Sequence, residues 1–209
     1  MKYTRIKRET LEYFDGLLEQ ASDDFAAIGY SKQSNIKRYC TLLKLGKFAN
    51  KSVLDVGCGI GGLYDFLQEQ GIQCEYVGID INPNMISRAK AKHQNMQDNF
   101  FVCDIIEEKL NKKFDYVVSN GPLNIKYATG SNLDITIKLM RRMYDLANIG
   151  TVITMTSFFT KKPNDTTFYY HPLELLKEVF TFCVNIKFDH TYLPHDFAVF
   201  CYKKDLYDF

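Results

Sequence analysis

Hydrophobic and polar positions follow two different patterns, and the change comes near residue 50. Before it, apolar residues recur at helical spacing: Leu11, Phe14, Leu17 and Leu18. This spacing predicts one helix, and Ser31 is a suitable N-cap for a second that ends at Gly46. The second helix is expected to carry Ile36, Tyr39, Cys40 and Leu43 on one apolar face. We therefore expect residues 1–50 to form an N-terminal helical cap.

From Lys51 onward, short apolar runs alternate with helical patterns. The predicted strands are residues 52–56, 75–79, 99–103, 114–119, 150–157, 184–191 and 197–202. The predicted helices are residues 63–70, 84–92, 133–147 and 172–180. Strands that alternate with helices indicate a parallel sheet with right-handed crossovers.

The last two predicted strands are joined only by a turn-rich segment, Leu193-Pro194-His195-Asp196. This connection is too short for a crossover, so the two strands must pair antiparallel. The predicted fold class is therefore α/β, a three-layer sandwich whose seven-stranded, mostly parallel sheet has a reversed C-terminal strand. At 209 residues the chain is read as one domain, with a cap over 1–50 and a core over 51–209.

Composition and charge narrow the function classes. The chain is 46% hydrophobic and 24% charged, as in ordinary globular proteins, and its net charge of +1 gives no general attraction to nucleic acid. Its apolar runs are too short to span a bilayer, and no apolar segment follows the basic N-terminus as it would in a secretory signal. The six cysteines show neither C-x-x-C nor metal-ligand spacing, so we expect reduced, mostly buried thiols and no metal. We expect a cytoplasmic protein with no membrane partner.

The most informative segment is Val53-Leu54-Asp55-Val56-Gly57-Cys58-Gly59-Ile60-Gly61-Gly62. Glycines directly after a strand let the backbone turn sharply and let a ligand come close. Such a loop, at the carboxyl end of the first strand, lines the crevice where open α/β sheets bind ligands. The spacing Gly57-x-Gly59-x-x-Gly62 also matches the dinucleotide fingerprint, so the glycines alone leave a nicotinamide-dependent oxidoreductase open.

Three acidic residues at strand ends favour a different ligand. Asp55 precedes the glycine loop, where a carboxylate would repel a pyrophosphate and attract a cationic group. Asp80 ends the second strand, the position at which a carboxylate accepts hydrogen bonds from ribose hydroxyls. Asp104 ends the third strand, within reach of an adenine amine. An adenosine with a positively charged tail fits all three positions.

With these residues the sequence resembles the class I S-adenosylmethionine-dependent methyltransferases. The resembling segments are residues 53–62, 77–86 with Ala89-Lys90, 103–105 and 114–123. They occur in the family's order, and that family's sheet also has a reversed last strand. The resemblance implies S-adenosyl-L-methionine as cofactor and S-adenosyl-L-homocysteine as product.

The resemblance also implies roles for individual residues. The loop residues Gly57, Cys58, Gly59 and Gly61 would pack against the methionine part, with Asp55 near its amino group. Asp80 would bind the ribose, and Ile81 and Ile105 would sandwich the adenine while Asp104 holds its amine. Met85 and Asn120 complete the predicted cofactor site.

Methyl transfer from a sulfonium is an in-line displacement that mainly requires alignment and exclusion of water, and a general base is optional. The candidate catalytic residues are Asn120, which faces the methyl group in this family, Tyr127 and His195. Enzymes that methylate exocyclic or amide nitrogens have Pro and an aromatic residue where this chain has Gly121 and Leu123, which weakens a nucleobase acceptor.

The helical cap without an added recognition domain suits a small-molecule acceptor, taking the methyl group on O or N. The alternatives are methylation of RNA, DNA or protein, and an inactive cofactor-binding partner subunit. Further polar residues that could meet an acceptor are Tyr30, Asn124, Tyr170, His171, His190 and Asp196.

Overall fold

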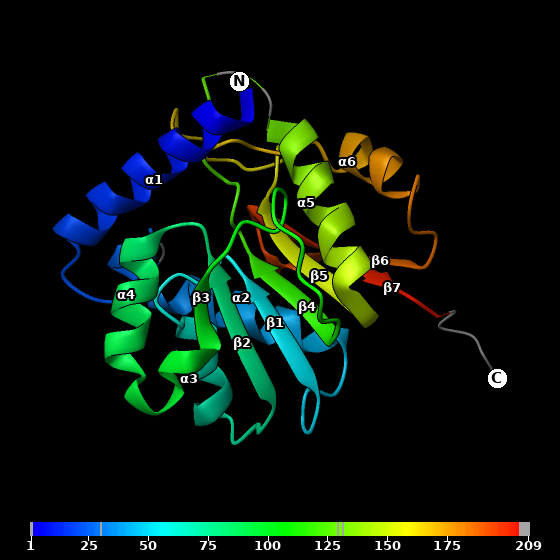
Figure 1. The fold of residues 1–209 in the computed structure, drawn as a ribbon. Coiled ribbons are helices and arrows are strands. Elements are labelled where there is room, and N and C mark those ends of the chain that lie inside the picture. The colour runs from blue at the N-terminus through cyan, green and yellow to red at the C-terminus, as the bar shows by residue number, and fades with distance from the viewer. Residues whose placement is uncertain (1, 30, 129, 131, 205–209) are drawn as a thin grey trace.

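The computed structural model describes residues 2–29, 31–128, 130 and 132–204. Its centre is a seven-stranded sheet with the order β3-β2-β1-β4-β5-β7-β6 (Figure 1). The strands are β1 (Ser52–Val56), β2 (Glu75–Asp80), β3 (Phe100–Val102), β4 (Phe114–Asn120), β5 (Ala147–Thr156), β6 (Ile186–Leu193) and β7 (Asp196–Tyr202). β1 to β5 pair in parallel, and β7 runs antiparallel to both of its neighbours. The predicted fold class is confirmed.

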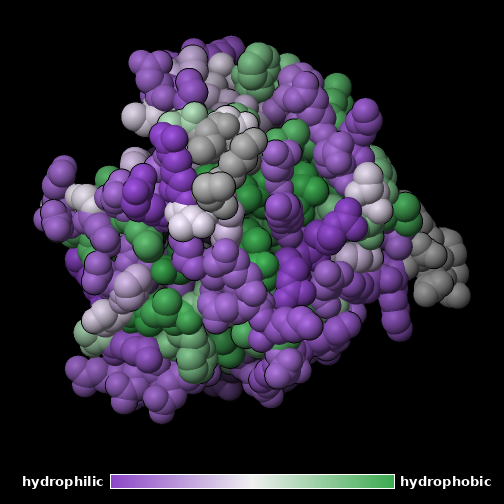
Figure 2. Space-filling model, turned by 45° about the horizontal axis from the view of Figure 1, so that its top comes forward, coloured by the Kyte–Doolittle hydropathy of each residue, from purple (hydrophilic) through white to green (hydrophobic). Residues whose placement is uncertain are grey.

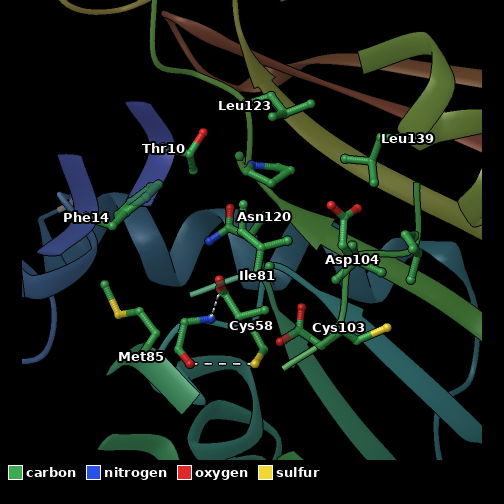
Figure 3. Close-up of a pocket in the computed structure, with 18 of the residues that line it drawn as sticks. Thr10, Phe14, Cys58, Ile81, Met85, Cys103, Asp104, Asn120, Leu123 and Leu139 are labelled. Atoms are coloured by element: carbon green, nitrogen blue, oxygen red, sulfur yellow. Dashed lines mark hydrogen bonds between the residues drawn. The ribbon is translucent and has the colours of Figure 1, made fainter. Parts of the chain in front are cut away.

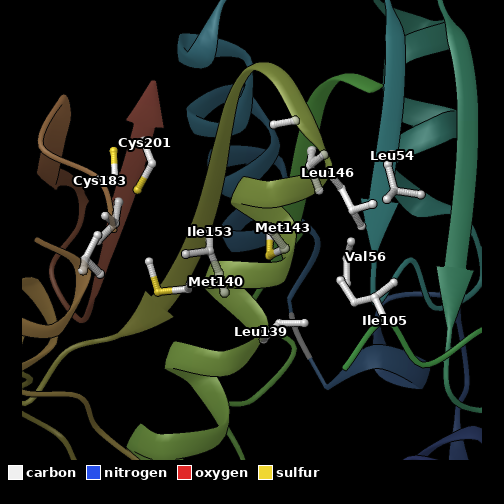
Figure 4. Packing of buried hydrophobic residues seen from close by; sticks show 14 of the residues in the cluster. Leu54, Val56, Ile105, Leu139, Met140, Met143, Leu146, Ile153, Cys183 and Cys201 are labelled. Atoms are coloured by element: carbon white, nitrogen blue, oxygen red, sulfur yellow. The ribbon is translucent and has the colours of Figure 1, made fainter. Parts of the chain in front are cut away.

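Helices cover both faces of the sheet, as the parallel strand connections require. α2 (Lys32–Leu42), α3 (Gly62–Glu69) and α4 (Pro83–Lys92) bury apolar side chains on one face. α5 (Asn132–Leu146) and α6 (Pro172–Val179) cover the other. Figure 4 shows this second layer, where Leu139, Met143 and Leu146 of α5 face Leu54 and Ile153 of the sheet.

α1 (Lys2–Gln20) lies outside these layers, across the ends of the strands (Figure 1). Near its start, Ile6 packs against Tyr127 and Ile135. Near its end, Phe14 and Leu18 pack in a cluster with Ile60 and Met85, next to the short helix η1 (Ala26–Ile28). α1 therefore spans the carboxyl edge of the sheet from one side to the other.

The apolar face predicted for α2 is only partly right. Tyr39 is buried and Ile36 is half-buried, but Cys40 is exposed. The inner face instead buries the polar residues Asn35 and Arg38. A pattern of apolar positions misses this arrangement because the buried polar groups find partners on the strand ends.

The final hairpin is tighter than predicted. β6 ends at Leu193 and β7 begins at Asp196, so only Pro194 and His195 lie between them. Leu193 extends the strand because its side chain is buried, and the register shifts between Asp189 and Leu193. All six cysteines are free; four are buried, as expected, whereas Cys74 is half-buried and Cys40 exposed.

Candidate functional site

The glycine loop leaves β1 in a conformation that only glycine adopts readily. Gly57 has a φ of 72°, and its N–H and that of Cys58 both donate to the Ile79 carbonyl at 2.8 and 3.0 Å. A Cβ at Gly57 would lie 3.1 Å from Pro122, so the loop packs closely against the segment after β4. Burial raises the pKa of the neighbouring Cys58 thiol, which keeps it protonated, as expected for a space-filling residue.

Asp80 sits at the end of β2 and is tied to this loop. One carboxyl oxygen accepts the Gly59 N–H at 3.0 Å and the other accepts the Asn82 N–H at 2.9 Å. Burial raises the pKa of Asp80, and these backbone donors act in the opposite direction. Because an ionised carboxylate has about four lone-pair sites, Asp80 keeps capacity for a further donor.

Asp104, which lies after β3, is contacted by two side chains of helix α1. The Tyr3 hydroxyl donates to both carboxyl oxygens, at 2.9 and 2.8 Å, and Lys7 Nζ lies 3.0 Å from Oδ2. The Ile106 N–H donates to Oδ1 at 3.0 Å. Burial and the Asp104 carboxylate both raise the pKa of Tyr3, which therefore acts as a donor.

Asp55 is buried within β1 rather than open at the mouth of the site. Its side chain is 2% exposed and accepts a hydrogen bond from the Tyr76 hydroxyl at 2.8 Å. Burial raises the pKa of Asp55 to about 7, with a smaller increase from Asp80, while the Tyr76 bond lowers it. A nearby cation would therefore shift Asp55 toward its charged form.

Asn120, at the end of β4, has both ends of its amide engaged. Its Oδ1 accepts from the Thr154 hydroxyl at 2.8 Å, and its Nδ2 donates to Asn35 Oδ1 at 2.6 Å. Thr154 is its register partner on β5, and Asn35 lies on α2. Two secondary-structure elements thus fix the orientation of the Asn120 side chain.

These strand ends surround one cavity with an empty volume of about 970 Å³, open solvent at its mouth included. Figure 3 shows Asn120 at its centre, with Phe14 and Met85 on one side and Asp104 on the opposite side. Figure 2 shows that polar side chains make up most of the surface on this side of the molecule, with apolar groups visible between them. The predicted cofactor residues that line the cavity are Asp55, Gly57, Cys58, Gly59, Asp80, Ile81, Met85, Asp104, Ile105 and Asn120.

The structure does not bring the other predicted residues to this cavity. Gly61 is the N-cap residue of α3, and a Cβ there would lie 2.7 Å from His93 Nε2, so the absence of a side chain serves packing. Tyr127 is buried behind the wall, where its hydroxyl meets that of the lining residue Thr10 at 2.8 Å, and burial raises the pKa of Tyr127 to about 12. His195 lies in the β6–β7 turn with its side chain 42% exposed.

The remaining polar candidates have local roles where they are described. Asn124 Oδ1 accepts from the Thr156 N–H and hydroxyl, and the Tyr170 hydroxyl donates to the Leu123 carbonyl. His190 Nε2 lies 2.8 Å from the Ser157 hydroxyl, and His171 occupies the N-cap position of α6 without a capping bond from its side chain. Asp196 forms a buried ion pair with Arg38 at 2.6 Å, and Tyr30 lies outside the described residues.

Sequence reasoning missed the contributions of the helical cap. Tyr3, Thr10 and Phe14 from α1, and Ile28 and Tyr39 from the following segments, line the same cavity. None belongs to a motif, because their positions depend on how α1 crosses the strand ends. Within the described ranges, no group of three or more His, Cys, Asp and Glu side chains is placed to hold a metal ion. No described helix has the length and apolar character needed to cross a membrane.

Comparisons with known proteins find matches over most of this chain. The family model described as a methyltransferase domain matches residues 47–200. The putative methyltransferase 235L of Invertebrate iridescent virus 6 is 29% identical over 163 residues, which cover 72% of this chain and 60% of that protein. The malonyl-(acyl-carrier protein) O-methyltransferase of Acetivibrio thermocellus is 37% identical over 80 residues, covering 38% of this chain and 28% of that one. The chain thus spans 60% or less of the length of these two curated relatives.

Among solved structures, magnesium protoporphyrin IX methyltransferase from Synechocystis PCC 6803 with bound S-adenosylhomocysteine matches with a TM-score of 0.68. The match covers 97% of this chain and 100% of that one at 15% sequence identity. At this identity the likeness establishes a shared fold.

Proposed function

The chain belongs to the class I, S-adenosylmethionine-dependent methyltransferase family, and from this premise we propose that it methylates an O or N atom of a small-molecule acceptor. One observation carries the proposal. Residues from the carboxyl ends of β1, β2, β3 and β4 meet on one cavity, and each has the chemistry that a part of S-adenosylmethionine requires. The Synechocystis protein with this fold is named for a small-molecule acceptor, which supports the substrate class.

The side chains at the ends of β2 and β3 fit an adenosine. The Asp80 carboxylate accepts backbone N–H groups of Gly59 and Asn82, with a further contribution from Ile81, and about four lone-pair sites leave it capacity to accept from the ribose. Ile81 and Ile105 supply apolar surface for the two faces of a purine, and Asp104 supplies acceptors for its amine. In this proposal Met85 packs beside the ribose and adenine.

The other end of the cavity fits a cationic tail better than a pyrophosphate. Gly57 and Gly59 lie there, close to Asp55 and Asp80. A positive charge would be attracted by the two carboxyls, whereas a pyrophosphate would be repelled by them. This argument favours S-adenosylmethionine over a nicotinamide dinucleotide.

When bound, S-adenosylmethionine supplies an electrophilic methyl group on a positively charged sulfur. The task of this chain is to align an acceptor with that group and to keep water out. We assign the alignment of the acceptor to Asn120, because Thr154 and Asn35 hold both ends of its amide by hydrogen bonds. α1 covers the site, and Tyr127 supports it by holding Thr10 of that helix. We assign no catalytic role to His195, because the β6–β7 turn that carries it does not line the cavity.

Calorimetric titration with S-adenosylmethionine, S-adenosylhomocysteine and NAD, side by side, tests the proposal. We expect saturable binding of both sulfur compounds and no heat from NAD. Binding of NAD without either sulfur compound would refute the proposed cofactor. Screening of small carboxylates, phenols and amines for methyl transfer then follows with the loaded protein.

A further inference from the structure

A second cavity, with an empty volume of about 1050 Å³ including open solvent, lies between η1, α2 and α3. Its walls include the aromatic and aliphatic side chains Phe25, Ile36 and Phe66. Charged residues also line it, with Lys32 and Glu69 exposed to solvent. An apolar chamber with a charged mouth is typical of sites for small amphiphilic molecules.

The second cavity adjoins the first. Ile28 and Tyr39 line both of them. The glycine loop also contributes to both, with Gly57 to Gly59 on the first and Ile60 and Gly62 on the second. A ligand in the second cavity would therefore have its inner end beside the β1 side of the first.

The β1 side is where the reactive end of the cofactor is expected. Asp80 and Asp104, the proposed ribose and adenine partners, lie at the ends of β2 and β3, the two strands at one side of the sheet. Gly57 and Asn120 lie at the ends of the neighbouring strands β1 and β4. This step rests on the proposed function, because it places the methyl group by the orientation of S-adenosylmethionine.

Asn35 connects the two cavities chemically. It lines the second cavity, and its Oδ1 accepts from Asn120, which lines the first. The Asn35 side chain is fully buried, yet its Nδ2 has no hydrogen-bond partner among the described residues. The Thr154 hydroxyl donates to Asn120, and Asn120 in turn donates to Asn35. This series of hydrogen bonds therefore ends at the amide nitrogen of Asn35, a donor that is not used. A buried donor without a partner is destabilising, and an occupant with a suitable oxygen would recover that loss.

We propose that the second cavity holds the methyl acceptor, a small molecule with an apolar, ring-sized body and a carboxylate that accepts a hydrogen bond from Asn35 Nδ2. A carboxylate has lone pairs for both the Asn35 N–H and the methyl group, whereas an amine has one lone pair and needs it for the attack. A carboxylate also needs no general base.

The transfer balances without a proton. A carboxylate oxygen uses a lone pair to form the new O–CH3 bond while the S–CH3 bond breaks and its electron pair stays on sulfur. The negative carboxylate and the positive sulfonium become a neutral ester and a neutral thioether. Among the lining residues, Asp24, Asp65 and Glu69 are acidic and Lys32 and Lys92 are basic, and Lys92 Nζ lies 2.6 Å from Asp65. Arg88, which lies outside the lining, pairs with Asp24 at 3.6 Å and offsets the third acidic charge.

Benzoate is a suitable probe, titrated into the protein saturated with S-adenosylhomocysteine and followed by ligand-observed NMR. We expect saturable binding of benzoate and none of aniline. Asn35→Asp keeps an oxygen for the Asn120 N–H but removes the donor, so benzoate should bind at least about ten-fold more weakly. Ile36→Trp fills the cavity and should abolish benzoate binding, whereas Lys37→Trp, at the next, exposed position of α2, should not change it.

The outcomes separate this inference from the proposed function. If S-adenosylhomocysteine binds all variants but benzoate binds Ile36→Trp or Asn35→Asp as it binds the unmodified protein, the acceptor assignment is wrong. It is also wrong if aniline binds in place of benzoate, or if neither binds the loaded protein. If S-adenosylhomocysteine itself does not bind, the proposed function fails, and the acceptor assignment with it.

Discussion

The contact between Tyr3 and Asp104 makes a prediction about cofactor affinity. Three donors surround the Asp104 carboxylate: the Tyr3 O–H is shared between both oxygens, the Ile106 N–H donates to Oδ1 and Lys7 Nζ pairs with Oδ2. An adenine amine that binds Asp104 must therefore compete with these donors. The Tyr3 hydroxyl is the one whose loss leaves the ion pair and the backbone bond intact.

The substitution Tyr3→Phe removes this competitor. A hydrogen bond to a charged group contributes about 1.5–3 kcal/mol, and the lower end applies here because one O–H is shared between two oxygens and Tyr3 is only half-buried. We expect S-adenosylhomocysteine to bind the variant about ten-fold more tightly, which corresponds to ~1.4 kcal/mol. The ligand-free variant should be less stable by a similar amount, about 1 kcal/mol, because Asp104 loses a donor.

Calorimetry and urea unfolding measure the two effects, which have opposite signs. Tyr13→Phe removes an exposed hydroxyl from the same helix and should change neither quantity. S-inosylhomocysteine, which has a carbonyl in place of the adenine amine, should gain nothing from Tyr3→Phe. An affinity for S-adenosylhomocysteine that stays equal or falls in Tyr3→Phe would refute the displacement argument and indicate that α1 closes over the cofactor through this hydroxyl.

Three further predictions concern named side chains. Asp80→Ala should weaken S-adenosylhomocysteine binding by ~3 kcal/mol, the loss of two hydrogen bonds to a charged group, as measured by calorimetry. Arg38→Met and Asp196→Leu should each lower the free energy of unfolding by about 3 kcal/mol, because one buried charge loses its partner, and the double variant should lose much less than the sum. Asp55 has a pKa of about 7 in the folded protein, above its unfolded value of about 4, so its contribution to stability is present at low pH and lost as the pH rises through 7. The Asp55→Asn variant should therefore have the same free energy of unfolding in urea as the unmodified protein near pH 4, and a higher one at pH 8 by up to ~4 kcal/mol. A difference that does not change with pH would contradict the raised pKa of Asp55.

Local sequence patterns predicted the sheet and its order of elements. The run Ser52–Val56 is confirmed to the residue, because a short apolar strand bounded by Lys51 and Gly57 has no other way to bury its side chains. The ends of the final hairpin were not predicted correctly, because the burial of Leu193 and the register shift in β6 depend on packing rather than on turn residues.

The same division holds at the candidate site. The glycine loop, Asp80 and Asp104 were found from the sequence because each lies at the carboxyl end of a strand, and parallel strands bring these ends to one edge. The burial of Asp55 was not predicted, because its hydrogen bond from the Tyr76 hydroxyl crosses the β1–β2 pair.

The sequence alone therefore determined the fold class and the strand-end residues, since these follow from spacing along the chain. Only the tertiary structure decided which residues of the helical cap belong to the site. Tyr3 contacts Asp104 across 101 positions, and Asn35 contacts Asn120 across 85. Such contacts are set by how α1 and α2 pack on the strand ends, where buried polar groups must find partners that no local pattern records.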